Sequence, residues 1–360
     1  MGQGNFGAVY GSEDGKYIFK AMHTDAVDLI ELEINANEIL MSGVGTMQKS
    51  SEAFYAQGVD FVTQYKGVLD VDDQKVLVFE RAQGSEMFKY LQDNPVKDSK
   101  GITIHARIGA ELANSIAVTH EAGLVHRDIK PENTMVHVNT DGTVMTKLID
   151  QGLACRKTDQ ESLSVFAGTP HFMALECFQE PPSPVSSAVD VYALGVTLVD
   201  NFFQEAPIKN FLLNGLENEY YPLPNNMIQY INAKIQQHAP DCALEDFNRQ
   251  GFYEKILANP DKYKNLFDPE KVYSDDQFKF LCGLIRDCVS PDPSARPSAA
   301  QAGYALEFFA ACMDDNARIE EHNAKPENKD HQLEKVTIPP YEVVMEMAKA
   351  DRPVEQEQPA

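Results

Sequence analysis

The sequence predicts a two-lobed α+β fold, with a small β-rich N-terminal lobe and a larger helical C-terminal lobe. Short apolar runs separated by turn residues fill residues 1–80, whereas apolar residues recur at helical spacing from about Met87 onward. Hydrophobic residues make up 43% of the 360-residue chain, which is enough for a sizeable core. Because ligand sites favour the seam between two such halves, we expect a functional site between the lobes.

The N-terminal lobe should be a small sheet with one helix. Residues 12–16 contain Asp-Gly and predict a hairpin turn between a strand that ends at Tyr10 and one that begins at Tyr17. Residues 76–79 predict a further buried strand. Residues 25–41 predict a helix, whose expected apolar side consists of Leu29, Leu32, Ala36, Ile39 and Leu40.

The C-terminal lobe should contain long helices and end in a polar tail. Helical apolar spacing covers residues 103–120, 188–203, 278–289 and 299–313. Charged residues, Asn and Pro dominate after residue 313, so we expect residues 314–360 to form an acidic, flexible tail. Within that tail, residues 341–348 have the pattern of a short helix or docking segment.

The net charge of −24 excludes nucleic acid and anionic membranes as expected partners, and it would attract basic ones. The same charge could serve solubility alone. We find no apolar stretch of bilayer length, no signal peptide and no myristoylation pattern. The six cysteines form no CxxC pair and are expected to be free thiols, so we predict a soluble protein of the cytoplasm or nucleus that is not secreted.

The most specific motif is the run from His126 to Asn133, HRDIKPEN. In such a loop Asp128 can orient an attacking hydroxyl and accept its proton, and Lys130 can hold the transferring phosphate. Asn133 can offer an amide oxygen to Mg²⁺. This run resembles the catalytic loop of the eukaryotic-type Ser/Thr protein kinase family, and a chance match in a solvated loop is a poor alternative.

Glycines near the N-terminus fit the same family. Gly2, Gly4, Gly7 and Val9 match G-x-G-x-x-G-x-V, in which glycines let backbone N–H groups approach phosphates. The motif lies between strands instead of opening a helix, which argues against a dinucleotide site. Lys20 resembles the strand lysine that grips the α- and β-phosphates of ATP.

The resemblance implies that a helix glutamate pairs with Lys20. Glu33 is our preferred candidate, Glu38 is the alternative, and Glu31 is the third acidic residue of the same helix. The spacing does not decide between them.

Asp150, Gln151 and Gly152 stand where the family has Asp-Phe-Gly, and Asp150 is the expected second Mg²⁺ ligand. Gln151 departs from the pattern. A buried glutamine needs hydrogen-bond partners, so we expect it to pair with Asn37 or else to face solvent.

Residues 150–176 resemble the activation segment of the family. By that resemblance Glu176 pairs with Arg296, Asp190 bonds the backbone of the catalytic loop, and His126, Arg127 and Gly152 are structural. Arg127 implies control by an anion on this segment. Ser164 is the preferred phosphorylation candidate, followed by Ser162 and Thr158, and Glu161 could instead supply a permanent charge.

Residues 79–88 resemble the interlobe hinge. The resemblance places Phe79 behind the adenine of ATP and assigns the adenine-binding backbone groups to Glu80 and Ala82. Glu86 and Glu132 would lie near a peptide groove and favour a basic protein substrate, although both could simply be solvated.

These motifs predict a kinase domain at residues 1–313, with the N-lobe at about 1–80, the hinge at 80–86, the C-lobe at 87–313 and a possible insertion within 205–275. The first strand should be truncated, because the first motif glycine is already Gly2. The expected function is transfer of the γ-phosphoryl group of ATP, with Mg²⁺, to Ser or Thr of a protein. A pseudokinase that acts as a binding module and a kinase for small molecules are the alternatives.

Overall fold

The computed structural model describes residues 2–4, 7–22, 27–47, 61–72, 74–179, 183–204, 233, 236–237, 256–329 and 331–352. Its N-terminal lobe is a five-stranded antiparallel sheet in the order β1-β2-β3-β5-β4. The strands are β1 (Gly2–Gly4), β2 (Gly7–Gly11), β3 (Tyr17–Met22), β4 (Tyr65–Val71) and β5 (Gln74–Glu80). The described part of β1 is Gly2–Gly4.

The C-terminal lobe is mainly helical, so the predicted two-lobed α+β fold is confirmed. Its helices are α3 (Met87–Asp93), α4 (Ser99–Glu121), α5 (Gln160–Leu163), α6 (Ala188–Phe202), α10 (Lys264–Phe267), α11 (Asp275–Cys288), α12 (Ala299–Ala324) and α13 (Tyr341–Asp351), with 3-10 turns η3 (Pro131–Asn133), η4 (Leu175–Phe178), η7 (Pro293–Ala295) and η8 (Pro326–Asn328). Two small sheets complete it, one with β6 (Ser85–Glu86), β8 (Thr134–Val138) and β9 (Val144–Leu148), the other with β7 (Leu124–Val125) and β10 (Cys155–Arg156).

Capping side chains explain where three of these helices begin. Asp98 accepts a hydrogen bond from the backbone N–H of Gly101 at 2.7 Å and starts α4. Ser274 and Ser298 form capping boxes at the first turns of α11 and α12. Each cap supplies partners for N–H groups that the helix itself leaves unpaired.

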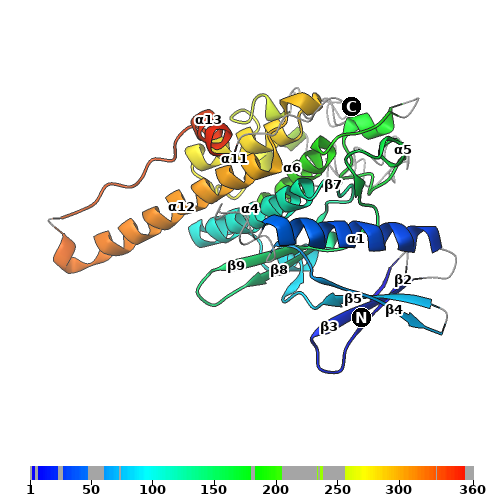
Figure 1. The fold of residues 1–360 in the computed structure, drawn as a ribbon. Helices are drawn as coiled ribbons and strands as arrows, with labels where there is room; N and C mark the ends of the chain where they lie inside the picture. The colour runs from blue at the N-terminus through cyan, green and yellow to red at the C-terminus, as the bar shows by residue number, and fades with distance from the viewer. Residues whose placement is uncertain are drawn as a thin grey trace.

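Helix α1 (Val27–Met47) lies between the sheet and the helical lobe (Figure 1). Ile30 and Ile34 pack with Leu77 of the sheet, and Ala36 and Leu40 join a second cluster with residues of α4 and β7. The helix therefore buries two apolar surfaces. The expectation that Leu32 belongs to its buried side is wrong, because Leu32 is 46% exposed.

The C-terminal region differs from the expected flexible tail in the part that the structure describes. α12 continues to Ala324, and residues 331–340 return along it before α13 begins (Figure 1). The side-chain amides of Asn316 and Asn323 each exchange two hydrogen bonds, of 2.7–2.9 Å, with the backbone of Val336 and Leu333 respectively. These bonds fix an extended segment that has few buried side chains of its own.

Helix α13 docks on α11 and α12 through apolar side chains at helical spacing. Tyr341, Val344, Met345 and Ala348 are buried, and the Tyr341 ring meets Phe280 edge-on, with ring centroids 5.7 Å apart. The short helix expected at residues 341–348 is thus part of the core of this lobe. Residues 205–275, where we expect an insertion, lie largely outside the described residues.

Gly283 on α11 has no side chain and so leaves room for the Tyr341 ring. A Cβ atom at residue 283 would lie 2.7 Å from the Tyr341 ring, so we expect Gly283→Ala to lower the free energy of unfolding by about 1–3 kcal/mol through overpacking. Thermal unfolding and proteolysis of the C-terminal segment measure this. Gly45→Ala in α1 is the matched control, because nothing lies within 4 Å of its Cβ position, and it should be neutral or slightly stabilising. An equal effect of both changes would contradict the docking role of Gly283.

In the described part of the chain, no helix is long and apolar enough to cross a bilayer. The cysteines described there, Cys155, Cys177, Cys282, Cys288 and Cys312, are free thiols.

Candidate active site

Lys20 of β3 connects the two lobes. Its Nζ lies 2.8 Å from both carboxylate oxygens of Glu33 on α1 and 2.8 Å from Oδ1 of Asp150. Glu33 is thus the one of the three candidate glutamates that contacts Lys20. Glu31 lies 3.5 Å from Lys75, and Glu38 is exposed. The Glu33 side chain is fully buried, so it depends on this charged partner.

The ionised forms of Lys20 and Asp150 stabilise each other. Burial alone would lower the pKa of Lys20, but the carboxylates of Asp150 and Glu33 outweigh it and raise that pKa above its usual value. Burial would raise the pKa of Asp150, and Lys20 holds it below the usual range. Both groups are therefore charged at neutral pH.

The catalytic-loop motif converges on Asp128. The hydroxyl of Thr169 donates to Asp128 Oδ1 at 2.7 Å, and Lys130 Nζ donates to Asp128 Oδ2 and to the Thr169 oxygen, both at 2.7 Å. The structure thus brings Lys130 and Asp128 together. Thr169 has no role in the sequence-based site, although it lies within residues 150–176, which resemble the activation segment of the family.

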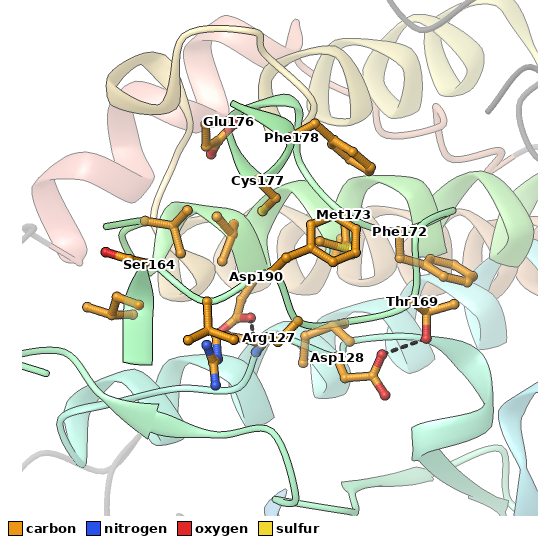
Figure 2. A pocket seen from close by; sticks show the side chains of 18 of the residues that line it. Arg127, Asp128, Ser164, Thr169, Phe172, Met173, Glu176, Cys177, Phe178 and Asp190 are labelled. Carbon is orange, nitrogen blue, oxygen red and sulfur yellow. Dashed lines mark hydrogen bonds between the residues drawn. The ribbon is translucent and has the colours of Figure 1, made fainter. Parts of the chain in front are cut away.

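Asp190 on α6 fixes the backbone of this loop (Figure 2). Its carboxylate accepts hydrogen bonds from the backbone N–H groups of His126 and Arg127 at 2.7 and 2.8 Å. Arg127 has φ 67°, a left-handed conformation that is unfavourable without such support. Nε2 of His120 lies 2.9 Å from the same carboxylate. Sequence reasoning missed His120, whose only signal is its position at the end of the predicted helix.

Arg127 and Ser164 line the same pocket, together with other side chains of residues 163–176 (Figure 2). The guanidinium donates to the carbonyl oxygens of Leu153 and Ser162 at 2.7 and 2.5 Å. The hydroxyl of Ser164 donates to the Gln160 carbonyl at 2.8 Å. Phosphorylation of Ser164 stays a prediction.

Glu176 and Arg296 form a two-point ion pair. Arg296 Nη1 and Nη2 lie 2.6 and 2.9 Å from the two Glu176 oxygens, and the Arg296 side chain is fully buried. Arg296 also donates to the carbonyls of Ser290 and Ala188. The pair ties the end of the segment at 150–176 to η7 and α6.

The expected nucleotide-binding residues lie on the sheet and the interlobe connection. Gly2, Gly4, Gly7 and Val9 belong to β1 and β2, while Asn5 and Phe6 between them lie outside the described residues. Val9 is paired in register with Lys20. Phe79 and Glu80 end β5, and Ala82 follows them at the connection.

Gln151 is buried, with 4% of its surface exposed. The expected bond to Asn37 is wrong, because the Asn37 amide donates to the Glu33 carbonyl of its own helix at 2.8 Å. The alternative, a solvent-facing Gln151, is also wrong. Oε1 of Gln151 is buried and has no hydrogen-bond partner within the described residues.

Asn133 and Asp150 fit the requirements of a magnesium site shared with a nucleotide. Asn133 donates its amide hydrogens to the main-chain oxygen and Oδ2 of Asp128 at 2.9 and 2.8 Å, which directs its amide oxygen away from them. No group of three or more His, Cys, Asp or Glu that could hold an ion alone occurs in the described ranges. Mg²⁺ held by one or two protein ligands and by phosphate oxygens suits this donor set.

Comparison with known proteins agrees with these motifs. The family model for the protein kinase domain matches residues 1–305. Calcium/calmodulin-dependent protein kinase type II of Caenorhabditis elegans is 35% identical over 122 residues, which are 34% of this chain and 16% of that protein. RAC-beta serine/threonine-protein kinase B of Xenopus laevis is 32% identical over 243 residues, 61% of this chain and 48% of the relative. MAP kinase kinase kinase win1 of Schizosaccharomyces pombe is 27% identical over 293 residues, 72% of this chain and 19% of the relative. The chain thus spans less than half the length of these curated relatives.

Proposed function

The chain belongs to the protein kinase family, and on that premise we propose that it transfers the γ-phosphoryl group of ATP to a Ser or Thr hydroxyl of a protein. The observation that carries the proposal is the position of Lys20 Nζ, 2.8 Å from the carboxylates of both Glu33 and Asp150. This arrangement holds the Lys20 ammonium between the two lobes and beside Asp150, the carboxylate that fits a magnesium ion.

Each residue has a distinct task in the proposed reaction. Lys20 binds the nucleotide phosphates, and Glu33 orients Lys20. Asn133 and Asp150 would hold Mg²⁺, which supplies charge neutralisation at the phosphates when bound. The backbone groups of Gly2, Gly4 and Gly7 would cover those phosphates, and the backbone of Glu80 and Ala82 would meet the adenine.

Asp128 orients the acceptor hydroxyl and takes its proton. The Thr169 hydroxyl already donates to Asp128 Oδ1, which supports a hydrogen bond of the same kind from a Ser or Thr substrate. Lys130, beside the other carboxylate oxygen, would stabilise the negative charge of the transferring group. The reaction thus relies on positioning and on charge compensation.

We further propose a basic protein substrate. Glu86 of β6 and Glu132 of η3 are both exposed, and β6 lies against η3. Two carboxylates close to the catalytic loop favour arginine or lysine near the acceptor. The buried free thiols support an intracellular location.

The binding-module alternative predicts nucleotide binding without transfer. The contacts among the side chains of the site argue against it, because Lys20 bonds to Asp150, and both Lys130 and Asn133 bond to Asp128.

Transfer of labelled γ-phosphate to synthetic peptides tests the proposal. We expect incorporation into a serine peptide with arginines ahead of the acceptor, loss of incorporation with EDTA, and a KM about threefold to tenfold higher for a peptide with glutamines in place of the arginines. The double variant Glu86→Gln, Glu132→Gln should reduce that difference. Nucleotide binding without any transfer would favour the binding module, and equal use of both peptides would remove only the basic preference.

A further inference from the structure

Thr158 has the basic neighbours that the proposed substrate preference requires. Arg156 and Lys157 directly precede it in the chain. No other Ser or Thr in the sequence has two Lys or Arg residues among the three residues before it. The carboxylates of Glu86 and Glu132, which favour a basic substrate, would therefore favour this segment of the protein itself.

The structure presents Thr158 in an exposed turn between β10 and α5. The backbone N–H of Asp159 donates to the Arg156 carbonyl at 3.0 Å, so Lys157 and Thr158 occupy the two central positions of the turn. Arg156 and Thr158 are both exposed. Within the described ranges the Thr158 hydroxyl makes no hydrogen bond. An acceptor hydroxyl in this state loses no protein contact when it enters an active site.

The two serines that follow are held by α5. The Ser162 hydroxyl donates to Asp159 Oδ2 at 2.7 Å, and the Ser164 hydroxyl donates to the Gln160 carbonyl at 2.8 Å. Both side chains are half-buried. Glu161 also directly precedes Ser162 and lies three residues before Ser164. A groove lined by carboxylates repels such an acidic neighbour, so these serines suit the proposed site less well than Thr158 does.

The turn is held away from the catalytic loop of its own chain. Arg156 pairs in register with Leu124 of β7, and the Lys157 backbone N–H donates to the Gly123 carbonyl at 2.9 Å. The other end of β7 leads into the catalytic loop and Asp128. Thr158 therefore lies beyond the end of β7 that is farther along the chain from Asp128. The acceptor hydroxyl can meet an Asp128 carboxylate more readily in a second copy of the chain.

We propose that Thr158 is a phosphorylation site that a second copy of this chain modifies in trans. The Thr158 oxygen forms a bond to the γ-phosphorus of ATP, and the bond from that phosphorus to the bridging oxygen breaks. The hydroxyl proton passes to Asp128 of the second copy, and ADP leaves with the electron pair of the broken bond. The proposal rests on the proposed function, because it requires phosphoryl transfer by this chain.

The test mixes two forms of the full chain that mass spectrometry can distinguish. The acceptor is ¹⁵N-labelled Asp128→Asn, and the enzyme is the unlabelled wild type, with ATP and Mg²⁺. We expect phosphate on Thr158 of the labelled chain, at an initial rate that rises with the wild-type concentration. Adding Thr158→Val to the acceptor should remove most of the phosphate that it takes up, whereas adding Ser164→Ala should not.

Two further acceptors test the role of the basic residues. Replacing both Arg156 and Lys157 with glutamine in the acceptor should lower the initial rate at Thr158 by about threefold to tenfold. The matched control replaces Lys97 and Lys100 with glutamine, which removes the same charge at two exposed positions near the start of α4. The control acceptor should be phosphorylated at the rate of the unchanged acceptor.

The outcomes separate this proposal from the proposed function. If the wild type phosphorylates a synthetic arginine-containing peptide but not Thr158 of the labelled chain, the trans site is overturned and the proposed function stands. Phosphate on Thr158 of the unlabelled chain alone, at a rate per chain that does not change with concentration, would mean transfer within one chain and would also overturn it. If neither the peptide nor the chain takes up phosphate, both proposals fail.

Discussion

Replacing Asp128 with asparagine is expected to lower kcat for phosphoryl transfer by about 10²–10⁴-fold. Asparagine keeps the shape of the side chain but cannot take a proton from the acceptor hydroxyl. The side-chain contacts of Asp128 are with Lys130, Asn133 and Thr169, whereas Lys20 contacts Glu33 and Asp150. The KM for ATP should therefore change little, and initial rates at varied ATP and peptide concentrations separate the two parameters.

Asp141→Asn provides the control for this change. Asp141 lies exposed in the turn between β8 and β9 and accepts hydrogen bonds from Thr143. The control variant should keep wild-type rates. If Asp128→Asn retained more than half of the wild-type kcat, Asp128 could not be the group that receives the proton.

The grouping of side chains around Asp128 was largely predictable because the motif that supplies them is local in sequence. The run from His126 to Asn133 places a base, a cation and an amide within one loop, and the structure gathers them around Asp128. The helix glutamate was harder to assign. Glu31, Glu33 and Glu38 point in different directions on a helix of 3.6 residues per turn, and α1 buries two faces. Helical spacing alone does not show which face meets Lys20.

Gln151 illustrates a second limit of prediction from the sequence. The sequence indicates that a polar side chain replaces an apolar one, but the partner of a single amide depends on atomic positions. Asn37 was a reasonable partner by position, yet it bonds to its own helix.

The C-terminal region was misjudged for a different reason. Its composition is that of a flexible tail, and residues 331–337 are indeed exposed. The side-chain amides of Asn316 and Asn323 hold the extended segment through its backbone, and Ile338 near its end is buried. The spacing of Tyr341, Val344, Met345 and Ala348 did predict a helix, but its docking site depends on Gly283, which is distant in sequence.

Arg296→Met is expected to lower the free energy of unfolding by about 3–5 kcal/mol, the range for breaking a buried ion pair by removing one partner. Methionine fills much of the same volume as arginine, so the lost free energy of unfolding comes from polar groups that no longer have a hydrogen-bond donor. Glu176, 14% exposed in its side chain, would keep its charge without its partner. The carbonyl oxygens of Ser290 and Ala188 would each lose a donor, and each unsatisfied group adds to the cost.

Urea-induced unfolding of the purified chain measures this effect, with Arg286→Met as the control. Arg286 has a side chain that is 36% exposed and pairs with its neighbour Asp287. Exposed pairs contribute about 0–1 kcal/mol, so the control should change the unfolding free energy by no more than that. Glu176 lies at the end of the segment that carries Thr169, so Arg296→Met should also loosen the contact between Thr169 and Asp128. We therefore expect a lower rate of phosphoryl transfer even at temperatures at which the variant is still folded. Equal stability of the two variants would mean that solvent or a rearranged donor replaces Arg296 at Glu176.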